Sequence, residues 1–157
     1  MSQILEIPVI HMLNDLDKEF IQSLQVSTDR SYRGFRHIEF EIDKEKSVYF
    51  YILDKQEDYF TQSIWDRTIP RAPFTLFLVE EINHTVQDLI TQYERKYATP
   101  YFIFIPFDKS VEDKSNDLAQ EDNESVFYFN SDEENGVIKT LLSALKQFTE
   151  RREEVEK

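Results

Sequence analysis

Residues 37–53 read HIEFEIDKEKSVYFYIL and contain two apolar segments joined by four charged residues. In residues 37–42, apolar and charged side chains alternate, which is typical of a strand with one buried face. Residues 47–53 form an aromatic-rich apolar run, which also predicts a strand. Parallel strands need a crossover of about a dozen residues or more. The short connection therefore predicts an antiparallel hairpin.

Strand and helix patterns alternate along the rest of the chain. Apolar runs predict four further strands, at residues 3–13, 74–79, 101–105 and 126–129. One-sided apolar periodicity predicts four helices, at residues 14–24, 60–68, 82–97 and 137–148. Loops are expected at residues 28–36 and 108–125. These elements predict a three-layer, doubly wound α/β domain over residues 1–150, with a six-stranded, mostly parallel sheet and one antiparallel hairpin, followed by a charged tail at residues 151–157.

The composition excludes several classes of site. The 157 residues include no cysteine, which excludes disulfide scaffolds, thiolate zinc sites and cysteine nucleophiles. Gly34 and Gly136 are the only two glycines, so a glycine-rich phosphate-binding loop cannot be written. The 31 acidic residues against 18 basic ones give a net charge of −13, which repels polyanions. Binding to nucleic acid or to an anionic membrane is therefore not expected.

Other catalytic and targeting patterns are missing from the sequence as well. His11, His37 and His84 lie on separate predicted elements without metal-ligand spacing, so we predict no metal site. No Gly-x-Ser-x-Gly motif is present. The chain has no basic leader and no apolar run near the roughly 20 residues of a membrane span. We expect a cytoplasmic protein without a cofactor and without membrane insertion.

The order of the predicted elements, with an antiparallel hairpin in second and third place among the strands, resembles that of Ras-like small GTPases. Residues 48–81, VYFYILDKQEDYFTQSIWDRTIPRAPFTLFLVEE, resemble the bacterial gliding-motility polarity branch of this superfamily (MglA-like) from its third strand through switch II into its fourth strand. Residues 126–148, VFYFNSDEENGVIKTLLSALKQF, resemble its last strand and closing helix. The resemblance covers nearly the whole chain and lies in the hydrophobic framework.

The nucleotide-binding motifs of that superfamily are altered in this sequence. When the phosphate-loop motif GxxxxGK[ST] is aligned on Lys18, Met12 and Asp17 replace the two glycines and Glu19 replaces the hydroxyl residue that binds Mg²⁺. Glycines at these positions let backbone N–H groups approach the phosphates. Side chains block that approach, and carboxylates repel the phosphates. The resemblance therefore implies a degenerate phosphate site.

The switch II and base-recognition motifs are altered in the same way. In the DxxG motif, Leu53 replaces the acid that orders Mg²⁺, Gln56 replaces the glycine, and Glu57 follows in place of the water-positioning glutamine. The NKxD motif aligns with Pro106, Phe107, Asp108 and Lys109. The resemblance with these losses implies a pseudo-GTPase, a protein that is not an enzyme and is not expected to hydrolyse nucleotide.

Basic and aromatic residues alternate where this family has switch I. We predict that this segment contacts a protein partner through Arg30, Tyr32, Arg33, Phe35 and Arg36. The adjoining switch II segment adds the interface candidates Asp54, Gln56, Glu57, Tyr59, Phe60 and Trp65. The three aromatic residues among them either extend the interface or line the core. The family resemblance suggests a Roadblock-domain protein or a motility or pilus component as the partner. A surface loop whose arginines offset nearby acids explains the first segment equally well.

Two alternative functions are compatible with the sequence. The acid-rich residues 108–134 are compatible with an inhibitor or immunity-type protein that mimics nucleic acid and blocks a basic partner. A receiver-like signalling domain would use Asp15 or Asp17, Asp54 and Lys109, which follow predicted strands. A receiver needs a helix between its second and third strands, however, so the predicted hairpin argues against that alternative.

Overall fold

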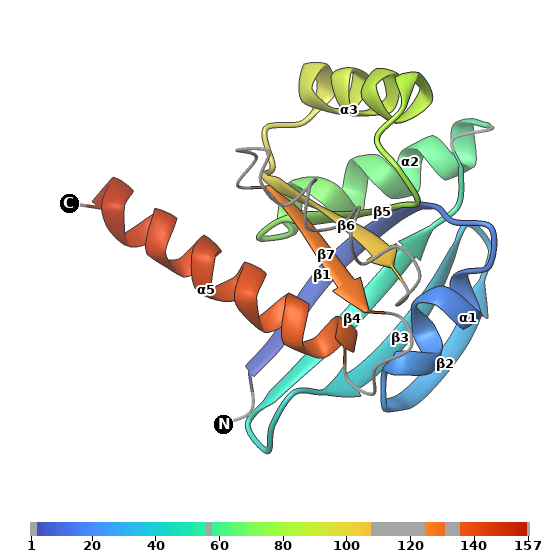
Figure 1. The fold of residues 1–157 in the computed structure, drawn as a ribbon. Coiled ribbons are helices and arrows are strands. Elements are labelled where there is room, and N and C mark those ends of the chain that lie inside the picture. Colours follow the sequence, from blue (N-terminus) through green and yellow to red (C-terminus); the bar gives the residue numbers. More distant parts are fainter. Residues whose placement is uncertain (1–2, 56–57, 108–124, 131–135, 157) are drawn as a thin grey trace.

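The computed structural model describes residues 3–55, 58–107, 125–130 and 136–156 (Figure 1). Its centre is a seven-stranded sheet in the order β2-β3-β4-β1-β5-β6-β7. The strands are β1 (Gln3–Met12), β2 (Val26–Tyr32), β3 (Phe35–Glu41), β4 (Lys46–Leu53), β5 (Thr75–Val79), β6 (Tyr101–Phe107) and β7 (Val126–Asn130). Strands β4, β1, β5, β6 and β7 run parallel, whereas β2, β3 and β4 pair antiparallel. The predicted α/β architecture with a mostly parallel sheet is confirmed.

The predicted hairpin is β3 and β4, joined through residues 42–45. Ile38 pairs with Phe50, and Phe40 pairs with Val48. All four side chains are buried, because they belong to the apolar half of each strand's alternation. The hairpin prediction is therefore confirmed in both its strands and its direction.

The sheet has seven strands rather than the predicted six. Residues 28–36, predicted as a loop, instead contribute most of β2, a tight turn at Gly34 and the first residues of β3. β2 is the edge strand, and nearly all of its residues are exposed or half-exposed. A strand exposed on both faces carries no apolar alternation, so its sequence does not reveal it. Backbone pairing with β3, from Val26–Phe40 to Tyr32–Phe35, holds it in place.

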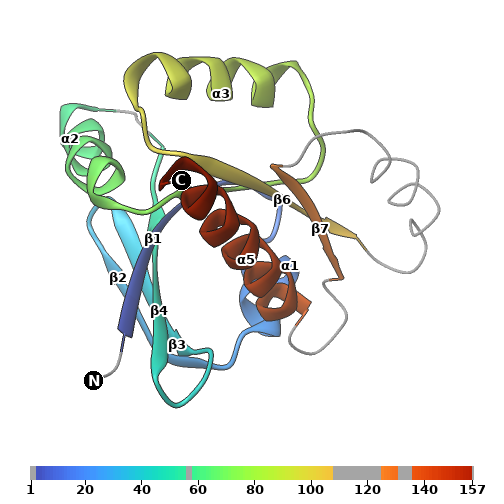
Figure 2. The same ribbon diagram turned by 90° about the vertical axis from the view of Figure 1, so that its left-hand side faces the viewer.

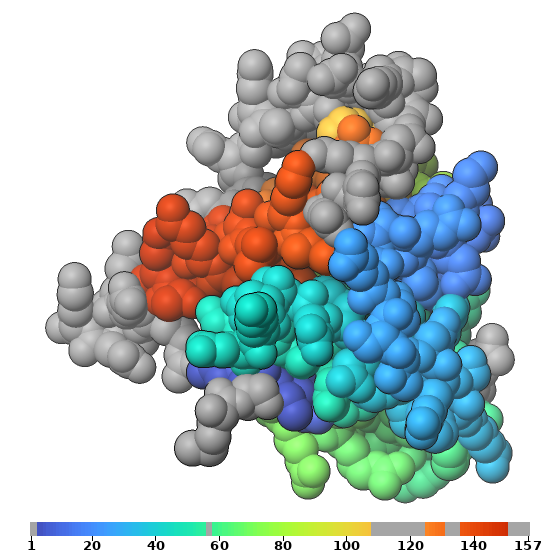
Figure 3. Space-filling model, turned by 90° about the horizontal axis from the view of Figure 1, so that it is seen from below, coloured from blue at the N-terminus to red at the C-terminus, as the bar shows by residue number. Residues whose placement is uncertain are grey.

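Helices cover both faces of the sheet, which completes the three layers (Figures 1 and 2). They are α1 (Leu16–Glu19), α2 (Tyr59–Thr68), α3 (His84–Lys96) and α5 (Gly136–Glu156), with two 3₁₀ turns, η1 (Ile21–Ser23) and η2 (Ile69–Arg71). Figure 3 shows α5, in orange and red, beside the blue α1–η1 segment, with α2 in green on the far side of the sheet. None of the helices in the described part of the chain has the length and apolar character needed to span a membrane.

Two predicted helices have different bounds in the structure. The helix predicted at residues 14–24 is interrupted at Phe20, whose φ of −131° is not helical. Phe20 is fully buried there and lies against the rings of Phe50 and Phe129. The closing helix, predicted to end at residue 148, continues to Glu156. The interruption at Phe20 follows from core packing, because the regular helix ends where the Phe20 side chain enters the core.

The hydrophobic core is divided by the sheet into two clusters. The larger cluster lies under α1 and α5 and is rich in phenylalanine, with Phe20, Phe40, Phe50, Phe74, Phe102, Phe104 and Phe129. The smaller cluster lies under α2 and α3 and includes Ile64, Trp65, Phe77, Val86 and Tyr93. The short strands β5 and β6 contribute side chains to both clusters, which explains their continuous apolar sequences.

Candidate functional site

The turn between β2 and β3 lies directly against α2. Gly34 in this turn has a φ of +92°, a conformation that L side chains rarely adopt. A Cβ atom at Gly34 would collide with Ile64 Cδ1 and lie 3.2 Å from Phe60 Cε1. The Asp54 N–H donates to the Gly34 carbonyl at 2.9 Å. The turn is therefore held in one position by its neighbours on α2 and β4.

The N-terminal residues of helix α2 lie beside the β2–β3 turn and form the adjoining part of the protein surface. Asp58 caps the helix by accepting a hydrogen bond from the Thr61 N–H at 2.8 Å, and the Asp58 N–H donates to Thr61 Oγ1 at 3.2 Å. The guanidinium carbon of Arg33 lies 4.2 Å from the centre of the Phe60 ring, which is cation–π geometry. Tyr59, the residue before Phe60, is 87% exposed.

Aromatic stacking continues the surface onto the sheet. The ring of Tyr32 stacks on Phe35 with centroids 5.0 Å apart, and Tyr32 is 49% exposed. We call the surface formed by Tyr32, Arg33, Phe35, Tyr59 and Phe60 the docking surface. The structure therefore brings together five of the residues that the sequence analysis assigned to a partner interface.

Arg36 is engaged in a different way from the docking surface. Its guanidinium forms ion pairs with Asp17 at 2.8 Å and with Asp29 at 2.6 Å. The hydrogen bonds from Arg36 hold the pKa of the Asp29 carboxyl below its usual range. Since neighbouring residues of a strand face opposite sides of the sheet, Arg36 points away from Phe35. Arg36 links β2 and α1 within the protein.

Trp65 belongs to the hydrophobic core rather than to the surface. Its side chain is only 5% exposed, and its indole N–H donates to the Asp54 carbonyl at 2.8 Å. Arg30, on the edge strand β2, pairs in register with His37 on β3. Gln56 and Glu57 lie outside the described residues.

Sequence reasoning did not single out Gly34 and Asp58 as supports of the docking surface, although the Asp-x-x-Thr spacing at residues 58–61 is a recognisable capping signal.

The carboxyl ends of the parallel strands are lined with acidic side chains. Met12 ends β1, and Asp17, Lys18 and Glu19 lie in α1. The Asn14 N–H donates to Glu80 Oε1 at 3.2 Å, and Asp15 caps α1 through the Lys18 N–H at 3.1 Å. Within the described residues, no group of histidine and acidic side chains has the arrangement of a metal site.

Glu19 is the most perturbed carboxyl at this edge. Its Oε2 atom is buried and makes no hydrogen bond. Burial raises the pKa of the Glu19 carboxyl above its ordinary value, and the charges of Glu80 and Asp15 raise it further. The ionised form is therefore less favourable in the folded protein than in the unfolded chain.

We expect Glu19→Gln to raise the urea midpoint of unfolding at pH 7, because the substitution removes that unfavourable carboxylate. The folded-state pKa lies above the unfolded-state pKa, so the gain is complete above the folded-state pKa. It disappears as the pH falls below the unfolded value of about 4.3. Urea titrations at pH 7 and pH 4 measure the effect, with the exposed Glu81→Gln as control. An unchanged midpoint at pH 7 for Glu19→Gln contradicts this account.

Two other predicted sites are resolved in part. Of the residues aligned with the base motif, Pro106 and Phe107 end β6, whereas Asp108 and Lys109 lie outside the described residues. The receiver alternative is contradicted by the topology, because β3 and β4 are joined by four residues without a helix. Most of residues 108–134, on which the nucleic-acid mimic alternative depends, also lies outside the described residues.

Comparison with known proteins identifies the fold. No protein-family model and no curated protein matches the chain. Among solved structures, the chain is similar to the Arl6 BBS3 small GTPase from Trypanosoma brucei with the bound nucleotide analogue GppNp. The TM-score is 0.57 and the sequence identity 12%, with 94% of this chain and 99% of that chain covered. The fold is that of Ras-like small GTPases, while membership of the MglA-like branch stays a prediction.

This likeness corrects one expectation from the sequence. The prediction that the chain is not an enzyme is wrong as it stands, because the fold it adopts is that of a GTPase. The altered motif residues were placed by alignment to a family pattern. They are substitutions in the sequence and do not show that activity is lost. The likeness at 12% identity shows the fold alone.

Proposed function

We propose that this protein is a GTPase-related protein that binds a protein partner through the docking surface, within a polarity, motility or signalling complex. The observation that carries the proposal is the exposure of Tyr32 (49%) and Tyr59 (87%), each next in sequence to one member of the Arg33–Phe60 cation–π pair. Tyrosine and arginine are enriched among residues that dominate binding energy at interfaces. A Roadblock-domain protein or a motility or pilus component is the proposed class of partner.

The support beneath the docking surface favours binding without large rearrangement. Gly34 fits closely over Ile64, and Asp58 fixes the first turn of α2 through Thr61. The Trp65 indole holds the end of β4 through the Asp54 carbonyl. Surfaces that are already ordered lose less conformational entropy on binding. The proposed interface is therefore built on rigid elements.

The local charge also suits a protein partner. Arg33 is a cation at the surface of a chain with a net charge of −13. The overall charge disfavours long polyanions, whereas a single arginine paired with aromatic rings suits a compact protein epitope. The proposed partner would present carboxylates and apolar side chains to this surface.

The double variant Arg33→Glu with Tyr59→Ala is expected to weaken partner binding by about 30-fold or more, since a hot-spot residue contributes about 2 kcal/mol. The partner is first isolated by affinity capture from cells that produce the protein, and its Kd is then measured by calorimetry with purified components. Arg95→Glu, an exposed change of the same charge on α3, is the control and should leave the Kd unchanged.

Partner binding that is unchanged in the double variant contradicts the proposal. Circular dichroism and urea titration confirm that the variant is folded before its binding is compared. Phosphate release from GTP in the presence of Mg²⁺ is a separate assay and measures the activity to which the fold points.

A further inference from the structure

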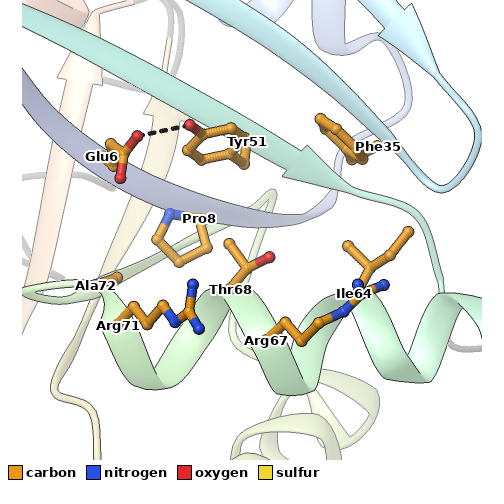
Figure 4. A pocket seen from close by; sticks show the side chains of 9 residues that line it. All are labelled: Glu6, Pro8, Phe35, Tyr51, Ile64, Arg67, Thr68, Arg71 and Ala72. Carbon is orange, nitrogen blue, oxygen red and sulfur yellow. Dashed lines mark hydrogen bonds between the residues drawn. The ribbon is translucent and has the colours of Figure 1, made fainter.

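A groove of about 430 Å³ lies between α2 and the sheet, next to the docking surface (Figure 4). Its apolar floor includes Pro8 from β1 and Ile64 from α2, both buried. Phe35 from β3 and Tyr51 from β4 form its aromatic wall, with ring centroids 6.0 Å apart. The volume lies within the range of about 300–1,000 Å³ that is typical of ligand-binding pockets.

Two arginines form the helical side of this groove. Arg67 at the end of α2 and Arg71 in η2 are four residues apart, and Figure 4 shows both side chains running along the helical side of the groove, with the Arg67 guanidinium beside Ile64. Both are exposed, and Arg67 Nε lies 3.4 Å from the Ser63 carbonyl oxygen. Among the residues that the structure describes, neither forms an ion pair with a carboxylate.

The opposite side of the groove carries a negative charge. Glu6 lies on β1, and its Oε1 accepts a hydrogen bond from the Tyr51 hydroxyl at 2.8 Å. The groove is therefore polarised, with two guanidinium groups along the helix and one carboxylate at the sheet. An anionic ligand group is favoured beside Arg67 and Arg71 and disfavoured beside Glu6.

We propose that this groove binds an acidic peptide segment of the protein partner, with an aromatic or branched aliphatic side chain between the aromatic wall and Ile64, and a neighbouring carboxylate on Arg67 and Arg71. Planar guanidinium groups bind carboxylates through paired hydrogen bonds. This inference rests on the proposed function, because the groove shares Phe35 with the docking surface and one partner would cover both.

The charges favour a short acidic peptide over other occupants. A nucleic acid would place many phosphates near a protein with a net charge of −13 and near Glu6. A peptide needs only one carboxylate close to the two arginines, and its apolar side chain uses the floor and the aromatic wall. A second copy of this acidic chain is the competing occupant, and the experiment distinguishes it.

The test uses the full chain, labelled with ¹⁵N, and a blocked five-residue peptide that has a central phenylalanine, one neighbouring acidic residue and neutral residues at the other positions. We expect saturable chemical-shift changes that concentrate at residues of the groove. We expect Arg67→Glu and Arg71→Glu each to weaken the peptide Kd at least tenfold, and exchange of the peptide phenylalanine for alanine to do the same. The control Arg95→Glu should change the Kd by less than twofold.

Several results would overturn the inference. These are no saturable shift up to a few millimolar peptide, shifts that map away from the groove, or equal weakening in Arg95→Glu. Sedimentation of the free chain as a dimer that Arg67→Glu dissociates would assign the groove to a second copy instead.

The two proposals fail in distinguishable ways. If the peptide does not bind but Arg33→Glu with Tyr59→Ala still abolishes partner binding, the groove inference is wrong and the proposed function stands. If the peptide binds in the groove and the double variant leaves partner binding unchanged, the docking surface is not the partner site, and the proposed function is wrong.

Discussion

Phe50→Ala is expected to lower the free energy of unfolding by about 3–5 kcal/mol, the typical cost of truncating a fully buried phenylalanine. Phe50 lies in β4 and is 0% exposed. Its ring centroid is 5.4 Å from that of Phe20 and 5.1 Å from that of Phe40. Loss of the ring removes apolar surface from the core and leaves a cavity where α1, β3 and β4 meet. Urea denaturation followed by circular dichroism measures the change.

The controls for Phe50→Ala separate core packing from general sensitivity to substitution. Tyr59→Ala removes an aromatic side chain that is 87% exposed, and we expect it to change stability by less than about 0.5 kcal/mol. Phe50→Leu keeps much of the volume and should cost less than Phe50→Ala. A loss below about 1 kcal/mol for Phe50→Ala would contradict the central position of this residue in the core.

The parts of the fold that could be predicted from sequence are those where burial leaves a pattern. The alternation in residues 37–42 and the apolar runs at residues 74–79 and 101–105 correspond to β3, β5 and β6 because one or both faces of these strands are buried. β2 left no such pattern, because its residues are exposed or half-exposed; backbone pairing with β3 and the Asp29–Arg36 ion pair hold it in the sheet. The strand count was wrong for that reason.

The candidate site was predictable to the extent that residue type indicates its role. Tyrosine and arginine residues at Tyr32, Arg33 and Tyr59 suggested an interface because they fall in the two switch segments of the resemblance. The ion pairs of Arg36 and the burial of Trp65 depend on contacts with residues distant in sequence, and no local pattern predicts them. The burial of Trp65 agrees with the alternative that it lines the core, and a binding role for Arg36 stays a prediction.

The groove could not be found from sequence for a related reason. Arg67 lies in α2, whereas Arg71 lies in η2, beyond the helix predicted at residues 60–68. The aromatic wall and Pro8 come from three strands, and their approach to α2 depends on the register of the sheet. A sequence pattern indicates the buried face of one strand or one helix, but it does not indicate which strand and helix faces pack against each other.

Gly34→Val is expected to lower the free energy of unfolding by about 3 kcal/mol and to weaken partner binding. The φ of +92° at Gly34 is strained for any L residue and most strained for a β-branched one. The added Cβ would also collide with Ile64 Cδ1. Strain of about 1–2 kcal/mol and overpacking of about 1–3 kcal/mol combine to give the expected loss. Urea denaturation and the partner Kd are measured on the same preparation.

Two further variants separate backbone strain from the collision at Gly34. Gly34→Asn tolerates a positive φ but still carries a Cβ, so its loss reports mainly the contact with Ile64. In a double-mutant cycle, Ile64→Ala should relieve part of the cost of Gly34→Val, giving a coupling energy of about 1 kcal/mol. Additive losses of stability in the two single variants would show that the side chain at position 34 does not collide with Ile64. If stability falls and partner affinity does not, the turn supports the fold alone, and the docking surface must lie elsewhere.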